Sequence, residues 1–261
     1  MRALKETSVL VREVESSGER ALDVPGAPST ARLAAWASTR FPANAQPLGL
    51  SVDDIPEPVS NPLLLNPLVS AGGSTGVALL TDYQPTMTTV VSWGKPVPIA
   101  DWTSAMQQAI DSGKPIVVLP PGRRYFMQGE VIVRGAVRLI DCLRGGLHEI
   151  FHGSGTSYRC TWVIADGAGP VELRGLRFAK ANCTVAQRSS RTLVLRDLSG
   201  GTYAGAMGTV HVIDSNVEGM EIATGQRAFL HGVCLENGQR TLITNHGGDL
   251  WGLGISSVSL R

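Results

Sequence analysis

Alternation of apolar and polar residues is the clearest local signal along the chain, and it predicts β-strands. Residues Ser8–Val14 place apolar side chains at alternate positions, as a half-buried strand does. Ile116–Leu119 is a short apolar run closed by two prolines and a glycine, which is typical of a buried strand. Two segments show the helical period instead. Ala31–Ser38 is a weak helical patch, and Asp101–Ser112 gathers its apolar residues on one stripe behind Asp101 as N-cap.

A six-residue unit recurs in the second half of the chain and is the strongest pattern in the sequence. The unit occurs six times, separated by 34, 22, 17, 18 and 22 residues, and it begins at Ala136, Pro170, Thr192, Thr209, Arg227 and Asp249. Its second position is always apolar, its fourth is apolar until the last unit, and its sixth is only Asp or Gly. Two inward positions and a turn residue, once in roughly 20 residues, indicate the coils of a parallel β-helix.

Proline and glycine divide the chain near residue 100. Residues 1–100 hold 11 of the 15 prolines and 7 of the 30 glycines, whereas residues 101–261 hold 4 and 23. Prolines recur without a period between Phe41 and Pro98, which predicts an ordered linker laid over other structure. We therefore expect a Pro-rich N-terminal arm and linker with one strand over residues 1–100, and a parallel β-helix domain over residues 101–261.

Composition and charge exclude several classes of protein. The 261 residues are 43% hydrophobic, enough for a core, and carry 23 basic against 22 acidic residues. This balance lacks the basic surplus of a nucleic-acid-binding surface. No run of 18 apolar residues could span a membrane, and no signal peptide is visible at the start. The four cysteines form no CxxC pair, which favours buried free thiols. The sequence does not decide whether two of them form a disulfide.

The segment from Asp101 to Tyr125 resembles the opening of the pectate-lyase-superfamily β-helix domain. Its sequence, DWTSAMQQAIDSGKP followed by IVVLPPGRRY, is similar to that family's capping helix, its strand ending in Pro-x-Gly, and its tyrosine before the first coils. The resemblance covers about residues 98–261. It implies an all-β protein, a single-stranded right-handed parallel β-helix with an N-terminal capping helix and an extended N-terminal arm.

The same family includes β-1,3-glucanase-type enzymes, polysaccharide lyases and phage tailspikes. The resemblance therefore implies a polysaccharide partner and an extracellular or cell-envelope location. Residues 9–18 and 48–58 more weakly resemble the end of an upstream β-helix and its exit linker in two-part members. Solenoids need capped ends, and no polar cap is visible before Arg261. We expect a piece of a longer protein, an end-capping partner chain, or a homo-oligomer.

The outward positions of the units form two columns that could contact a ligand, because neighbouring coils stack ~4.8 Å apart. The third position reads Arg138, Glu172, Val194, His211, Phe229 and Trp251. The fifth reads Ile140, Arg174, Arg196, Ile213, His231 and Leu253. Aromatic rings stack on sugars and charged groups bind hydroxyls or uronates, although an ordinary solvated face has the same composition. The candidate substrate-binding residues are Phe229, Trp251, Arg138 and His231.

Acidic residues at the sixth position suggest catalysis. Asp197 and Asp214 fall in consecutive coils, and a retaining glycosidase needs two carboxyls ~5–5.5 Å apart. Asp141 is the third acid at this position. Paired acids could equally hold Ca²⁺ for a lyase, with Arg196 or Arg174 as the base. Asp and Gly also share this position because both tolerate turn conformations. The candidate catalytic residues are Asp197, Asp214, Arg196, Arg174, His211 and Glu172. No cofactor is expected, apart from Ca²⁺ in the lyase case.

The segment His148–His152 reads HEIFH and matches the HExxH zinc motif. The motif works on a helix, where both histidines share one face. Glycines on either side leave barely one and a half turns here, and in a strand the two histidines would lie ~13 Å apart. We expect no metal site and keep a metal-dependent hydrolase using His148 and His152 as a minor alternative.

Three functions follow from these patterns. The first is a carbohydrate-active β-helix that degrades a polysaccharide, as glycoside hydrolase or lyase, and the sequence favours such an enzyme. The second is a non-catalytic β-helix segment for glycan binding or a structural spike. The third is the metal-dependent hydrolase. An enzyme predicts a groove over the two columns and an acid with a raised pKa. A structural segment predicts no groove, and it predicts that Asp197 and Asp214 bond to the amides of the turns.

Overall fold

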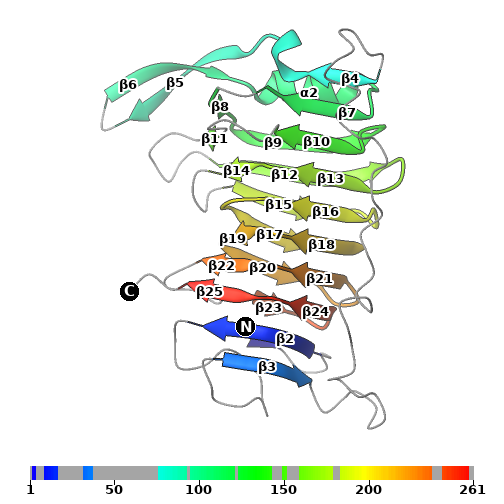
Figure 1. Cartoon of the computed structure of the whole chain (residues 1–261). Coiled ribbons are helices and arrows are strands. Elements are labelled where there is room, and N and C mark those ends of the chain that lie inside the picture. Colours follow the sequence, from blue (N-terminus) through cyan, green and yellow to red (C-terminus); the bar gives the residue numbers. More distant parts are fainter. Residues whose placement is uncertain are drawn as a thin grey trace.

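The structure is a computed structural model of the chain, and it describes residues 2–3, 9–16, 32–37, 76–92, 95–120, 123–142, 149–151, 159–178, 183–236 and 243–258. The described residues are predominantly in β-strands, and nearly all strand pairs are parallel. This agrees with the predicted all-β class. The arrangement is compatible with a parallel β-helix, because short strands from successive parts of the chain lie on top of one another (Figure 1).

The strands form three stacks, each ordered along the chain. The first stack contains β4 (Val77–Leu79), β7 (Ile116–Leu119), β10 (Leu139–Cys142), β13 (Val171–Arg174), β16 (Leu193–Arg196), β18 (Thr209–Ile213), β21 (Arg227–His231) and β24 (Asp249–Leu253). The second contains β9 (Gly129–Gly135), β12 (Cys160–Gly167), β15 (Cys183–Gln187), β17 (Thr202–Gly205), β20 (Gly219–Ile222) and β23 (Ile243–Asn245). The third has shorter strands: β8 (Tyr125–Phe126), β11 (Glu149–Phe151), β14 (Arg177–Phe178), the bridge residue Ser199, β19 (Asn216–Val217), β22 (Cys234–Glu236) and β25 (Ser256–Val258).

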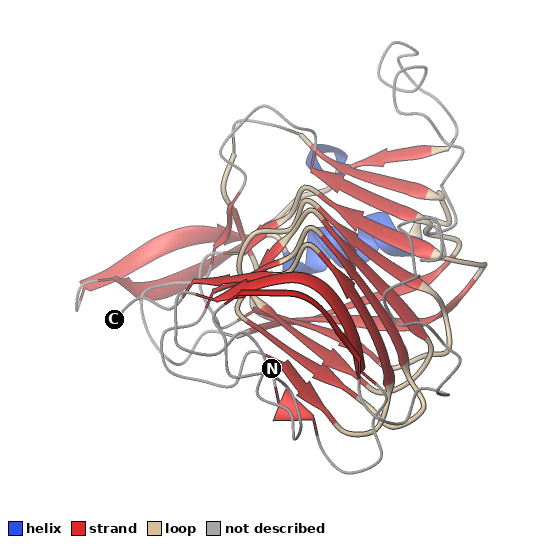
Figure 2. Cartoon of the chain, turned by 60° about the horizontal axis from the view of Figure 1, so that its bottom comes forward, coloured by secondary structure: helices blue, strands red, loops and turns tan. Residues whose placement is uncertain are grey.

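The chain passes from the first stack to the third and then to the second, as in β7, β8 and β9, and we call each such passage a coil. Figure 2 shows the strands arranged around a common interior. One large apolar core fills it, and it includes Trp162 edge-on to Phe178 with ring centroids 6.3 Å apart. The core is continuous because each coil buries its inward side chains against the coils above and below it.

The register of the first stack confirms the predicted alignment for five of the six units. Val171 pairs with Leu193, and the pairing continues in register through β18, β21 and β24. The alignment of the first unit was wrong by one residue, since Ile140 pairs with Leu173. Val137 and Ile140 both lie in the main core, so Leu139 faces outward against Ile116 and Val118. A shift of one residue exchanges the two faces of a strand.

The N-terminal strands join the far end of the same stacks. The predicted strand Ser8–Val14 is confirmed as β2 (Val9–Ser16), which pairs in parallel with β24 and β25, while β1 (Arg2–Ala3) pairs with β23. The helical patch predicted over Ala31–Ser38 was wrong. It forms β3 (Arg32–Ala37), antiparallel to β2, because ladder hydrogen bonds override a weak helical preference.

The predicted linker Phe41–Pro98 lies partly outside the described residues, and its described part is more regular than expected. It contains β4, a 3-10 turn (Leu80–Asp82), and the antiparallel hairpin of β5 (Thr86–Ser92) and β6 (Lys95–Asp101). The hairpin projects from the end of the stacks that carries β4 (Figure 1). The division of the chain at residue 101 stays a prediction.

The predicted helix over Asp101–Ser112 is confirmed as α2 (Thr103–Asp111), next to β4 and β7, but its N-cap residue is Trp102 and not Asp101 (Figure 1). The Asp101 carboxylate accepts hydrogen bonds from the Thr103 backbone N–H at 2.9 Å and from its hydroxyl at 2.6 Å. The apolar stripe Ala105, Met106, Ala109 and Ile110 is buried in the core. Gly113 then ends the helix with φ of 76°.

Side chains of α2 also cap the edge strand of the second stack. The Gln107 side chain accepts from the Ile132 N–H at 2.8 Å and donates to the Ile132 carbonyl at 3.2 Å. One turn earlier, the Thr103 hydroxyl accepts from the Gln128 N–H at 2.9 Å, and it shares its single proton between the Asp101 carboxylate and the Gln128 carbonyl, which lies 3.0 Å away. These side chains replace the hydrogen bonds of a missing neighbouring strand, so the helix protects an edge that would otherwise invite pairing.

Candidate functional site

The outward face of the first stack brings most of the predicted columns together, with two exceptions. The register places Leu139 beside Glu172 and Asp141 beside Arg174. Arg138 and Ile140 therefore do not occupy the columns predicted for them, because the first unit is shifted by one residue. The remaining third-position and fifth-position residues follow the predicted order from β13 to β24.

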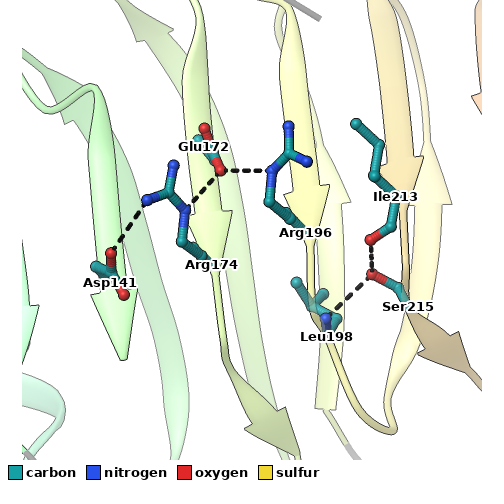
Figure 3. A network of polar contacts seen from close by, with 7 residues as sticks. All are labelled: Asp141, Glu172, Arg174, Arg196, Leu198, Ile213 and Ser215. Carbon is teal, nitrogen blue, oxygen red and sulfur yellow. Dashed lines mark hydrogen bonds and ion pairs between the residues drawn. The ribbon is translucent and has the colours of Figure 1, made fainter. Parts of the chain in front are cut away.

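Four charged residues in β10, β13 and β16 form an ion-pair ladder (Figure 3). Glu172 Oε1 accepts from Arg174 Nε at 2.8 Å and from Arg196 Nε at 3.1 Å. Arg174 also reaches Asp141, with Nη1 3.6 Å from Oδ2. The two acids are buried, and about a quarter to a third of each arginine side chain is exposed. The ladder ties three coils together.

The electrostatics of the ladder fix the protonation of Arg174. Burial would lower its pKa, but the hydrogen bond and charge of Glu172, with the charges of Asp141 and Asp197, outweigh burial and raise the pKa. A lyase base must lose its proton before it can abstract one from the sugar. The surroundings of Arg174 oppose that loss, so this site is unfavourable for an arginine-based elimination.

Three rings continue the face into β18, β21 and β24 as an aromatic stack. His211 and Phe229 lie 4.9 Å apart and nearly parallel, and Phe229 and Trp251 lie 4.7 Å apart in the same way. The guanidinium of Arg227 lies 5.4 Å from the Phe229 centroid and 5.6 Å from that of Trp251. Both ring faces of Phe229 are thus covered, and only its edge remains for a ligand. His231, one column further, is exposed.

His211 sits in this stack as a neutral side chain. It is 6% exposed, and burial, followed by the charge of Arg227, lowers its pKa to about 4. A base with that pKa is weak at neutral pH, whereas general bases work best with a pKa near the working pH. The position of His211 between Val194 and Phe229 therefore favours packing over proton transfer.

The acids Asp197 and Asp214 occupy left-handed turns. Their φ angles are 54° and 46°, and no other described non-glycine residue has a positive φ. Gly175, Gly232 and Gly254 adopt similar angles at the same place in their coils. Ser215 supports the stacked turns, since its hydroxyl donates to the Ile213 carbonyl and accepts from the Leu198 N–H (Figure 3). The turn-forming interpretation thus accounts for these acids, while Asp141 lies within β10 instead.

Two glutamates in the third stack form a candidate site that the sequence reasoning missed. Val217 pairs with Leu235 and both are buried, so the following residues, Glu218 and Glu236, face outward from neighbouring coils. Burial and then the negative charge of Glu236 raise the pKa of Glu218. Two carboxyl groups whose surroundings separate their pKa values are the usual basis for an acid–base pair.

The immediate surroundings of this acidic pair are polar and small. Asn216 Nδ2 donates to Glu236 Oε2 at 2.6 Å, while the buried Asn216 Oδ1 accepts no hydrogen bond. The Glu218 N–H donates to the Gly201 carbonyl at 2.8 Å, so the preceding coil contributes no side chain at this point. The signal in the sequence was the 18-residue interval between the two acids, which equals that between the units at Thr209 and Arg227.

The last predictions from the sequence concern the HExxH segment, metal sites and the four cysteines. His148 and His152 lie outside the described residues. Among the residues that the structure describes, no group of three or more His, Cys, Asp or Glu side chains could hold a metal ion. All four cysteines are free thiols, and burial raises the pKa of Cys183 well above its usual value. Within the described ranges, no helix is long and apolar enough to cross a membrane.

Comparison with known proteins gives no further identification: no family model matches the chain, and neither a curated protein nor a solved structure is similar enough to count as a match.

Proposed function

We propose that the chain is a right-handed, single-stranded parallel β-helix that degrades a polysaccharide as a glycoside hydrolase. The observation that carries the proposal is the pairing of Glu218 with Glu236, in which one carboxyl has a raised pKa beside the other. The three stacks of parallel strands support the fold, and the likeness of Asp101–Tyr125 to pectate-lyase-superfamily openings supports the polysaccharide. An extracellular location and a family relationship belong to the same proposal.

In the proposed reaction, Glu218 is the acid and Glu236 the nucleophile. Protonated Glu218 donates its proton to the glycosidic oxygen as the bond to the anomeric carbon breaks, and the Glu236 carboxylate forms a glycosyl ester. Glu218 then takes a proton from water, whose oxygen replaces Glu236 at the anomeric carbon, so one water is consumed per bond. Neighbouring coils separate the two backbones by ~4.8 Å, which suits the ~5–5.5 Å between carboxyls in retaining enzymes.

Other residues of the pair's surroundings have supporting roles. Asn216 holds one oxygen of Glu236 by its 2.6 Å hydrogen bond, which leaves the other oxygen to face the substrate. Gly201, whose carbonyl accepts from the Glu218 N–H, itself adds no side chain at this point. Candidate residues of the first stack also offer contacts for the polymer, since His231 is exposed and Arg196 and Trp251 are half-buried.

Product analysis tests this function. The wild-type protein and the variants Glu218→Gln and Glu236→Gln are incubated with neutral and uronic-acid polysaccharides, with and without chelator, and the products are weighed by mass spectrometry. We expect saturated oligosaccharides from the wild type and a loss of at least ~10³-fold in each variant, while Asp214→Asn keeps activity. Unsaturated products, or activity that survives both glutamine substitutions, contradict the proposal.

A second candidate is a non-catalytic segment that binds glycan or forms part of a spike. One observation favours it: the ion-pair ladder and the aromatic stack fill the first-stack face with mutual contacts, and Glu172, His211 and Phe229 are at most 6% exposed. A folded protein that yields no product from any polysaccharide but is retained on one of them in affinity electrophoresis would support this second function.

A further inference from the structure

Arg191 is a buried cation that spans three coils. It starts in the turn between β15 and β16, and only 6% of the residue is exposed. Its Nε donates to the Gly169 carbonyl at 2.5 Å, and its Nη2 donates to the Val137 carbonyl, which belongs to an earlier coil. Gly167 leaves room for the side chain, because a Cβ there would lie 2.7 Å from Arg191 Nη1.

A second arginine, Arg138, shares this corner of the molecule. It directly follows Val137, whose carbonyl Arg191 binds, and its positive charge acts on the Arg191 guanidinium. Burial and this charge lower the pKa of Arg191 to about 10, so its guanidinium is still a cation at neutral pH. Water screens the buried Arg191 guanidinium poorly, whereas Arg138 is half-buried.

Neither arginine has an acidic partner among the residues that the structure describes, where the ion pairs involve Arg134, Arg174, Arg188 and Arg196 instead. Two donors are also left over, since Arg138 Nε and Arg191 Nη1 are buried and bind no acceptor. Carbonyl oxygens satisfy some N–H groups of Arg191 but carry no net charge. Buried charges in proteins are normally paired, and an unsatisfied buried donor calls for a water or an ion.

We propose that Arg138 and Arg191 together bind a small inorganic anion at this corner between the first and second stacks. The anion would accept hydrogen bonds from Arg138 Nε and Arg191 Nη1 and would balance the two charges. Both donor atoms are buried, so a free ion such as chloride, phosphate or sulfate suits them better than a group on a polymer. The proposal is independent of the acidic pair.

Such a site would join coils that lie far apart in the sequence. Arg191 already connects its own turn to Val137, 54 residues earlier. An anion held by both arginines removes the repulsion between them and therefore stabilises the stack of turns formed by Arg138, Gly169 and Arg191. By mass action, an anion that binds only the folded chain raises the unfolding temperature in a saturable way.

Thermal unfolding of the full chain in chloride, phosphate and sulfate tests the proposal, with ionic strength held constant by a bulky organic sulfonate. We expect at least one anion to raise the unfolding temperature along a saturating curve. Arg138→Gln should shift the midpoint of that curve at least tenfold, because it removes one charge and the Nε donor. Arg134→Gln is the matched control, since Arg134 is half exposed and pairs with Asp111.

The possible results separate an anion site from a simple clamp. A linear, non-saturating rise that is equal in the wild type and both variants reflects general salt effects and overturns the proposal. If Arg138→Gln does not fold, Arg138→Lys replaces it, because lysine keeps the positive charge but lacks Nε. A saturating curve of the Lys variant that is identical to that of the wild type would also overturn the proposal. Anomalous scattering from bromide-soaked crystals gives the direct view: a peak between the two guanidinium groups supports the site, and its absence at saturating bromide overturns it.

Discussion

The hydrogen bonds of Gln107 to the edge strand β9 give the sharpest test of how the end of the stacks is capped. Replacing Gln107 with Ala removes both bonds to the Ile132 backbone, of 2.8 and 3.2 Å. Ile132 is half-buried, so water replaces the lost bonds only in part. At ~1 kcal/mol for each bond, the free energy of unfolding should fall by about 2 kcal/mol. For a chain of this size, the unfolding temperature should fall by roughly 4–8 °C.

The matched control is Gln108→Ala, because Gln108 is the exposed neighbour in the same helix. Both substitutions gain the same helix propensity, so their difference reports the side-chain bonds of Gln107, which are the two bonds to β9 and an exposed bond of 3.2 Å to Asp111. Gln107→Glu should lie between the two, since it keeps the acceptor for the Ile132 N–H and loses the donor for the carbonyl. Chemical denaturation followed by far-UV circular dichroism gives the free energies. Equal stability of the Gln107 and Gln108 alanine variants would refute this account of the cap.

Three further substitutions probe the packing of the coils. The pKa of His211 is about 4 in the folded protein, below its ordinary ~6.5, so its contribution to stability is complete above pH ~6.5 and falls as the pH drops towards 4. His211→Phe should abolish that part of the pH dependence of the free energy of unfolding, measured in urea. An unchanged pH profile would contradict this prediction. Gly205→Ala places a Cβ 1.9 Å from Gln226 Oε1 and should cost about 1–3 kcal/mol, whereas Gly76→Ala, with its nearest contact at 3.9 Å, should change stability by less than about 0.5 kcal/mol. Glu172→Gln should cost about 2 kcal/mol because both of its arginines lose a buried counter-charge, and a neutral effect in thermal unfolding would show that the ladder contributes no net stability.

The inward positions of the coils could be predicted from the sequence, because burial imposes a repeating apolar pattern. Five units aligned correctly on that pattern alone, and so did α2, whose apolar stripe is buried. The first unit misled the alignment, since Val137 looks like the start of a strand but precedes it. The pattern records which residues are apolar, and it does not record where a strand begins.

The candidate site was harder to predict, because outward residues follow no periodic constraint. The sequence suggested Asp197 and Asp214 for their regular position, and that regularity reflects the left-handed turn that Asp and Gly tolerate. Glu218 and Glu236 each come four residues after the left-handed turn residue of their own coil, Asp214 and Gly232, and the strands beside them are too short to show alternation. Only the pairing of β19 with β22 brings them together, and the effect of Glu236 on the pKa of Glu218 follows from that geometry.

The most direct test of the account is the titration of Glu218 by NMR of a ¹³C-carboxyl-labelled protein. We predict that the pKa of Glu218 lies above the ordinary ~4.3 of a glutamate and falls when Glu236 is replaced by Gln. Because the pKa of Glu218 is raised in the folded state, its charged form destabilises the folded protein above that pKa. Glu218→Gln should therefore increase the free energy of unfolding at neutral pH, and this increase should disappear below pH ~4.3. A Glu218 that titrates in the ordinary range, with no response to Glu236→Gln, would contradict the acid–base pair on which the proposed function rests.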